Sequence, residues 1–122
     1  MANNTIFRYG PANLTASAAN LLNPGTVTGG ASSPGSSLYI ILRHIRIVNR
    51  TNAPHYFSLF IGGTGGSTSG TEFMGYQTVV PPNSAMDWYG AVRLGTSDYL
   101  TGLADTTACL TIEGEGEVGI VL

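Results

Sequence analysis

The chain has 122 residues, a length typical of one domain, and it can bury a single hydrophobic core without disulfide bonds. Only 10% of its residues are charged, against about 25% in an ordinary domain, whereas 43% are hydrophobic. A surface with so few charges is largely neutral or apolar, and partners that cover part of it would explain this composition. The net charge of -2 excludes the strongly basic surface that non-specific nucleic-acid binding requires.

All five basic residues are arginines, and the sequence contains no lysine. Arginine is favoured at protein interfaces because it forms bidentate pairs and is less strongly hydrated, although a GC-rich coding genome would give the same bias. The longest uninterrupted apolar run, residues 38–42, is far shorter than the ~20 residues of a membrane span. The N-terminal sequence MANNTIFRYG lacks the basic and apolar regions of a signal peptide. Neither a nucleic acid nor a membrane is therefore expected as a partner.

Residues 1–37 are predicted to form an N-terminal arm that precedes the domain. Residues 6–9 could be a short edge strand, and residues 13–22 a weak helix or a strand. The rest of the segment consists mostly of Gly, Pro, Ala, Ser, Thr and Asn, and a long stretch with so few large side chains is rarely packed into a domain. The arm is either a flexible lead-in or an extended segment that becomes ordered by lying across a neighbouring subunit.

The densest run of β-branched and aromatic residues is SLYIILRHIRIVNRT, residues 37–51, which also holds three of the arginines. Read with a period of two, neither face of this strand is cleanly polar. A bulge near Arg43 and His44 would exchange the two faces at that point. We predict a central strand of a sandwich. Its odd face carries Tyr39, Ile41, Arg43, Ile45 and Ile47, and its even face carries Leu38, Ile40, Leu42, His44, Arg46 and Val48.

Residues 38–122 are predicted to form an all-β domain, an antiparallel β-sandwich or jelly roll of about eight or nine short strands. Turns rich in Gly, Pro and Asn recur at intervals near ten residues, which is typical of these folds. The strand at 55–61 is expected to form a hairpin with the central strand. Further strands are expected at 71–74, 76–80, 85–89, 91–94, 99–100, 108–112 and 118–122, with loops at 62–70 and 103–107.

None of the sequence patterns predicts an enzyme or a cofactor. The loop GGTGGSTSG at 62–70 lacks the lysine of a phosphate-binding loop, and no Gly-x-Ser-x-Gly turn is present. A zinc site built on His44 and His55 would need Cys109 and a distant carboxylate to complete it. We interpret both histidines as partly exposed sheet residues instead. No catalytic, cofactor-binding or metal-binding residue is therefore predicted.

Three carboxylates share one face of an extended strand because each alternates with a glycine: Glu113, Glu115 and Glu117. Like charges so close together favour cations opposite them. The arginines that could supply this charge, within the fold or across a subunit boundary, are Arg43, Arg46 and Arg50. We predict that these six residues contact a partner. A calcium site and a solvated edge strand that prevents aggregation are the alternatives.

Aromatic residues offer a second candidate surface. Trp88 and Tyr89 are adjacent, next to a predicted turn, and Tyr76 lies on the preceding predicted strand. Trp88 is either a core residue or, together with Tyr89 and Tyr76, part of an aromatic platform that binds sugar or protein.

Two stretches carry a resemblance to a known family: LRHIRIVNRTNAPHYFSLFIGGTGGSTSGTEF at 42–73 and VVPPNSAMDWYGAVRLGTSDYLTGLA at 79–104. They resemble small virion proteins of tailed bacteriophages, above all those that infect actinobacteria. The shared pattern is a strand with Arg-His-Ile and Val-Asn, a sandwich hairpin with a Gly-rich tip, and a later segment with Pro-x-Asn-Ser, Asp-Trp-x-Gly and Arg-Leu. The resemblance covers about residues 38–118 and leaves the N-terminal segment outside.

The resemblance implies a non-enzymatic structural role, as a capsid decoration (head cement) protein or as a tail or baseplate component. A decoration protein would be a homo-oligomer, with a trimer favoured, that binds the major capsid protein and stabilises the head, and residues 1–37 would help to contact the shell. A tail component would instead bind tail proteins. The protein would be made in the host cytoplasm and located on the surface of the virion. The alternative from another class is a carbohydrate-binding module for host-surface glycans.

Overall fold

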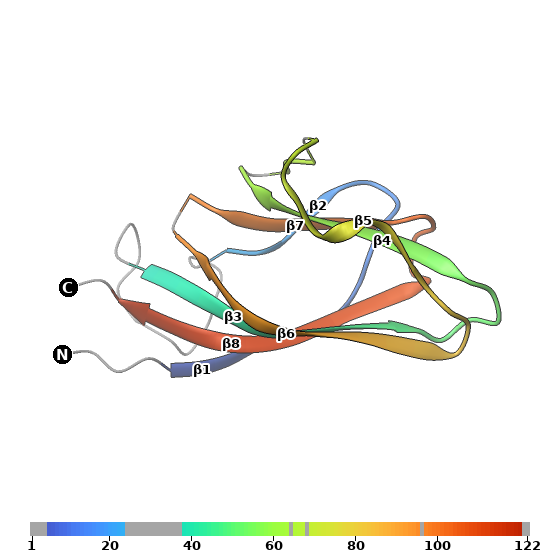
Figure 1. Ribbon diagram of the computed structural model, residues 1–122, viewed down its shortest axis with the longest axis horizontal. Coiled ribbons are helices and arrows are strands. Elements are labelled where there is room, and N and C mark those ends of the chain that lie inside the picture. The colour runs from blue at the N-terminus through green and yellow to red at the C-terminus, as the bar shows by residue number, and fades with distance from the viewer. Residues whose placement is uncertain (1–4, 24–37, 64, 68, 96, 121–122) are drawn as a thin grey trace.

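The computed structural model describes residues 5–23, 38–63, 65–67, 69–95 and 97–120, which form eight strands in two four-stranded sheets (Figure 1). No helix long and apolar enough to cross a membrane occurs among these residues. All paired strands are antiparallel, so the predicted all-β class is confirmed. The strands are β1 (Thr5–Asn13), β2 (Ala19–Leu22), β3 (Leu38–Asn49), β4 (His55–Gly62), β5 (Glu72–Val80), β6 (Ser84–Leu94), β7 (Tyr99–Ala104) and β8 (Leu110–Ile120).

Sheet A has the strand order β1-β8-β3-β6, and sheet B has the order β2-β7-β4-β5. The chain passes from one sheet to the other at every connection except that between β4 and β5, as the two layers in Figure 1 show. The predicted hairpin between β3 and β4 is therefore wrong, because these strands lie in different sheets. The turn at 51–54 makes a corner between the sheets, and a short turn with Asn and Pro is compatible with either geometry.

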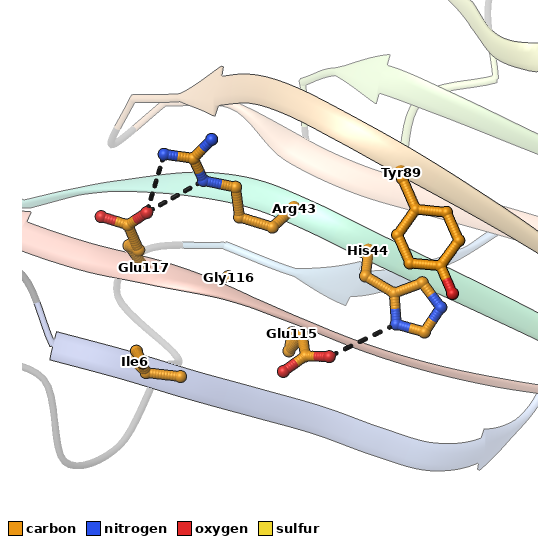
Figure 2. Close-up of a pocket in the computed structure, with 7 residues that line it drawn as sticks. All are labelled: Ile6, Arg43, His44, Tyr89, Glu115, Gly116 and Glu117. Carbon is orange, nitrogen blue, oxygen red and sulfur yellow. Dashed lines mark hydrogen bonds and ion pairs between the residues drawn. The ribbon is translucent and has the colours of Figure 1, made fainter.

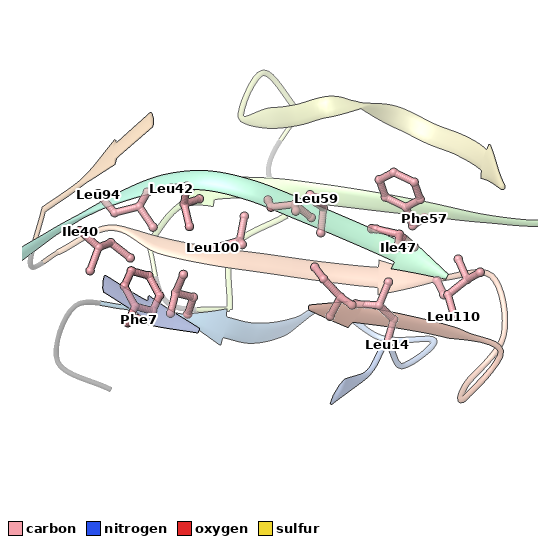
Figure 3. Close-up of a cluster of buried hydrophobic side chains, with 14 of the residues drawn as sticks. Phe7, Leu14, Ile40, Leu42, Ile47, Phe57, Leu59, Leu94, Leu100 and Leu110 are labelled. Carbon is pink, nitrogen blue, oxygen red and sulfur yellow. The ribbon is translucent and has the colours of Figure 1, made fainter. Parts of the chain in front are cut away.

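The hydrophobic core is one cluster of side chains drawn from both sheets (Figure 3). Strand β3 lies between β8 and β6, which confirms its predicted central position. Burial of this apolar surface is the main favourable term that holds the two sheets together. The cluster contains Phe7, Leu14, Leu22, Ile40, Leu42, Ile45, Ile47, Phe57, Leu59, Val80, Leu94, Leu100, Ala104, Leu110, Ile112 and Val118.

Strand β3 contains a bulge at Arg43, where its register against both β6 and β8 shifts. Before the bulge the buried side chains are the even-numbered Ile40 and Leu42. After it they are the odd-numbered Ile45 and Ile47. A bulge adds one residue to one strand, so the alternation of side chains changes phase across it. The exchange of faces that the sequence allowed at this point is present in the structure, and it explains why neither face of this strand is cleanly polar in the sequence.

The N-terminal segment contributes to both sheets. Strand β1 pairs with β8, and β2 pairs with β7. Phe7, Leu14 and Leu22 are buried in the core. Residues 5–23 therefore belong to the domain, in contrast to the predicted arm that ended at residue 37. The remaining part of that arm, residues 1–4 and 24–37, lies outside the described residues. A few widely spaced apolar residues suffice here because the strands are held by backbone hydrogen bonds to their neighbours.

Glycines that the sequence suggested as breaks lie inside continuous strands. Gly75 is within β5 and Gly90 is within β6, while β8 runs through the whole Glu-Gly alternation. Strand β5 accommodates the irregularity with positive φ angles at Met74, Gly75 and Gln77. The register of β5 and β6 against their partners shifts at Gly75 and Gly90, and pairing continues on both sides of each glycine, so a glycine there interrupts the pairing without ending the strand.

The placement of residues 5–23 in the core predicts a stability effect of Leu14→Ala. Leu14 is completely buried, so its truncation should lower the free energy of unfolding by about 2–5 kcal/mol, measured by urea denaturation. Ile6→Ala on the same segment is the matched control, because Ile6 is 78% exposed, and it should change stability by no more than about 0.5 kcal/mol. Equal stability of the two variants would mean that the segment does not pack into the core.

Candidate functional site

The outer face of sheet A, within the described residues, carries a connected group of charged and aromatic side chains. On β8, the glutamates point outward while Ile112, Gly114, Gly116 and Val118 are buried, and on β1 Phe7 is buried between two exposed side chains. The outer face of sheet A thus carries Ile6 and Arg8 from β1, Glu113, Glu115 and Glu117 from β8, Arg43, His44 and Arg46 from β3, and Asp87 and Tyr89 from β6.

The glycines between the glutamates have a structural cause. A Cβ atom at Gly116 would collide with the carbonyl oxygen of Ile41, and one at Gly114 would collide with the carbonyl oxygen of His44. Both glycines pair with the part of β3 that flanks the bulge. Only glycine lets β8 approach the bulged backbone so closely, and the same alternation fixes all three glutamates on the outer face.

Ion pairs connect the three strands β8, β3 and β6 across this face. The Nε and Nη2 atoms of Arg43 lie 2.9 and 2.8 Å from Oε2 of Glu117, as Figure 2 shows. His44 lies between two carboxylates, with Nε2 2.7 Å from Oδ1 of Asp87 and Nδ1 3.5 Å from Oε1 of Glu115.

Arg46 completes this row of charges. Its Nε donates to Oδ1 of Asp87 at 2.8 Å, and Glu113 lies opposite it on β8. The hydrogen bonds from Arg46 and, next, from His44 hold the pKa of the Asp87 carboxyl below its usual value. The pKa of Arg46 is raised in turn, mainly by its hydrogen bond to Asp87. Asp87 is therefore an ionised anchor for two β3 side chains.

Apolar side chains flank the charges. The ring of Tyr89 stacks on His44, with centroids 4.5 Å apart and an angle of 12° between the planes, and Tyr89 is 70% exposed. Ile6 is on β1, at the other side of a shallow groove of about 260 Å³ (Figure 2). An adjoining hollow of about 200 Å³ shares His44 and Glu115 with this groove and is bordered by Arg8.

Five of the six residues predicted to contact a partner lie on this face; the sixth, Arg50, follows the end of β3 in a separate hollow beside Asn83 and Ser84. Arg43 and Arg46 find their carboxylates within the chain, which is one of the two arrangements considered from the sequence. The glutamates do not form a sheet edge, because β8 lies between β1 and β3.

The three aromatic residues predicted as a platform do not share a surface. Trp88 packs edge-on against Phe73 with ring centroids 5.0 Å apart and contacts the core. Tyr76 lies against Phe60 on the other sheet. Tyr89 alone of the three is on the outer face of sheet A.

Four residues of this face were missed in the sequence: Ile6, Arg8, His44 and Asp87. The alternation of Ile6 with Phe7 was the available signal for β1. The pairing of His44 with Asp87 depends on the register between β3 and β6, which no local pattern encodes.

A comparison with models of known protein families finds no match, and a comparison with curated proteins finds no similar sequence. Function is therefore inferred from the geometry of this chain. On the outer face of sheet A, each of Arg43, His44 and Arg46 already has a carboxylate partner, and exposed Ile6 and Tyr89 stand on either side of them. Such a face can be covered by another surface without leaving an unpaired charge at these positions.

The lowered pKa of Asp87 predicts a pH-dependent effect of Asp87→Asn. A carboxyl group whose pKa is lower in the folded state stabilises the fold at pH values above its unfolded value of 3.8, and this stabilisation is lost as the pH falls through the folded value. The variant should therefore unfold at lower urea concentration than the unaltered protein at about pH 7, and the difference should shrink in strong acid. Glu113→Gln, on the same face, is the control and should have a smaller effect. A difference that stays constant with pH would contradict this role of Asp87.

Proposed function

We propose that this protein is a non-enzymatic structural protein of a bacteriophage particle, namely a capsid decoration protein that binds the shell as a homo-oligomer. The observation that carries the proposal is the outer face of sheet A, where internally paired charges lie between exposed Ile6 and Tyr89. The resemblance of residues 38–118 to small virion proteins of tailed phages supplies the kind of partner.

The strand order supports this class of protein. The strand orders β1-β8-β3-β6 and β2-β7-β4-β5, with a chain that passes repeatedly between the two sheets, support a jelly roll as the fold that we propose. Jelly rolls occur in viral capsid proteins, but also in lectins and cupins. Because one fold hosts many functions, the surface chemistry and not the topology has to carry the proposal.

The outer face of sheet A has the chemistry of a protein-binding surface. Tyrosine and arginine are the residue types that most often dominate binding energy at interfaces, and Tyr89 and Arg43 lie beside the same groove. Burial of an exposed side chain such as Ile6 contributes about 1.5–3 kcal/mol. Since the neighbouring charges are already paired, a partner would not have to supply a counter-charge for each of them.

Oligomerisation would turn a modest contact into stable attachment. A trimer would present three copies of the outer face of sheet A to a three-fold position of the shell, and the second and third contacts would then form at high effective concentration. The low content of charged residues, 10%, suits a chain that uses one part of its surface for self-association and another for the major capsid protein.

The proposal predicts that Ile6→Glu and Tyr89→Glu abolish binding to the shell. The purified protein would be added to heads that lack it, and the bound fraction would be measured after sedimentation. Both side chains are exposed, so the variants should remain folded. A small loss of thermal stability is expected, because position 6 faces Glu117 on β8 and Tyr89 stacks on His44. The added carboxylate makes burial of the face costly. The expected result is at least a hundredfold loss of affinity, or roughly 3 kcal/mol.

Ala53→Glu is the matched control, because it adds the same charge in the exposed turn between β3 and β4 and should leave binding unchanged. Images of particles with the bound protein would show whether it is on the head or on the tail. Failure of the unaltered protein to bind heads, or full binding by both face variants, would contradict the proposal.

A further inference from the structure

Three side chains with metal-binding atoms meet at one end of the fold, away from the outer face of sheet A. His55 is the first residue of β4, just after the corner that connects sheet A with sheet B. Asp105 directly follows β7, and Cys109 directly precedes β8. The start of β4 is bonded to the connection after β7, since the backbone N–H of Asp105 donates to the carbonyl oxygen of Tyr56 at 3.1 Å.

The three side chains point their ligand atoms at one another. Nδ1 of His55 is 3.0 Å from each carboxylate oxygen of Asp105, and Sγ of Cys109 is 3.5 Å from Oδ1 of the same carboxylate. One ligand atom from each residue lies within 4.8 Å of the other two. The side chains of His55 and Asp105 are only 17% and 22% exposed, so the group is partly shielded from water.

This group has fewer donor protons than acceptor atoms within hydrogen-bond distance. Nδ1 of His55 carries at most one proton for two carboxylate oxygens at the same distance, and it would give up that proton on binding a metal. Sγ of Cys109 has one proton for two acceptors, Oδ1 of Asp105 and the carbonyl oxygen of Thr106 at 2.9 Å. Several lone pairs therefore converge without a matching number of donors. A cation placed among them would interact with all of these lone pairs at once.

We propose that His55, Asp105 and Cys109 form a binding site for a divalent transition metal of the zinc type. Thiolate and imidazole ligands favour zinc and its neighbours, whereas calcium and magnesium take oxygen ligands almost exclusively. Three protein ligands leave a fourth position for water or an outside ligand. With zinc–ligand distances of about 2.0–2.3 Å, neighbouring ligand atoms of a tetrahedral site are roughly 3.3–3.7 Å apart. The carboxylate of Asp105 already lies near this distance from both partners, so only His55 and Cys109, which are within 4.8 Å, would have to approach each other, by up to roughly 1 Å.

The backbone that carries two of the ligands is held in place. Residues 14–16 bind the connection between β7 and β8 on both sides: Ala104 N donates to Thr15 O at 2.8 Å, Ala108 N to Leu14 O at 3.0 Å, and Ala16 N to Thr107 Oγ1 at 3.0 Å. Asp105 and Cys109 are thereby presented from a braced loop. Such bracing lowers the ordering cost of metal binding.

Burial, followed by the hydrogen bond to Asp105, raises the pKa of the Cys109 thiol. A bound metal would have to displace the thiol proton, as at any cysteine ligand. The bound metal would cross-link the start of β4 to the connection between β7 and β8, and so join the two sheets at this end.

The test is a titration of the reduced full-length protein with Zn²⁺ and, as a spectroscopic probe, with Co²⁺. We expect one equivalent to bind, with the absorption of a cobalt–thiolate bond, and roughly a tenfold slower alkylation of Cys109. At free Zn²⁺ about a hundredfold above Kd, the melting temperature should rise by roughly 10 °C. Cys109→Ser and His55→Gln should lose this binding.

His44→Gln is the matched control, because it removes the other histidine, which contacts Asp87 and Glu115 instead, and it should bind the metal like the unaltered protein. If Cys109→Ser does not fold, alkylation of the unaltered protein still decides the question. Unchanged alkylation and melting at saturating Zn²⁺, or undiminished binding by His55→Gln, would overturn the proposal.

Discussion

The bulge at Arg43 is the constraint on which the rest of sheet A depends. It changes the phase of β3, so that Ile40 and Leu42 before it and Ile45 and Ile47 after it all face the core. Without the extra residue, one half of this strand would turn its apolar side chains to solvent. The bulge thus allows one twelve-residue strand to bury apolar side chains in the core on both sides of Arg43.

The same bulge creates the outer face of sheet A. By exchanging the faces it turns His44 and Arg46 outward, where Asp87 on β6 and the glutamates on β8 face them. It also requires glycine at 114 and 116 on the neighbouring strand, so the Glu-Gly alternation follows from backbone packing as much as from charge. Core and outer surface are therefore two consequences of one local irregularity, and a substitution at either glycine would disturb both.

Local patterns predicted the all-β class and the central position of β3, and they indicated a change of faces near Arg43 as one possibility. Each of these depends on residues close together in the chain: β-branched runs, turn residues and the phase of one strand. Features that depend on the pairing of distant strands were missed. The turn at 51–54 gave no sign that β4 lies in the other sheet. The possible strands at 6–9 and 13–22 were assigned to an arm, because few large residues in 5–23 indicated that they pair with β8 and β7.

In the candidate sites, too, local features could be predicted from the sequence and contacts between distant strands could not. The Glu-Gly alternation predicted a face of carboxylates. Which side chains pair with these carboxylates depends on the strand order β1-β8-β3-β6. Asp105 and Cys109 are four residues apart, whereas His55 is fifty residues before Asp105. His55 reaches Asp105 because β4 pairs antiparallel with β7, which places the start of β4 beside the residue after β7. Physical proximity of that kind follows from topology, and the sequence encodes it only through the whole fold.

Strand β1 links stability to the proposed function. It pairs with β8, and its successive residues serve opposite roles, since Phe7 is buried in the core while Ile6 stands exposed beside the groove. Removal of the N-terminal segment would therefore unfold the domain and erase the outer face together, and a loss of binding after truncation would not identify a contact. Single substitutions at neighbouring positions separate the two roles, because alternation in a strand assigns adjacent side chains to opposite faces of the sheet.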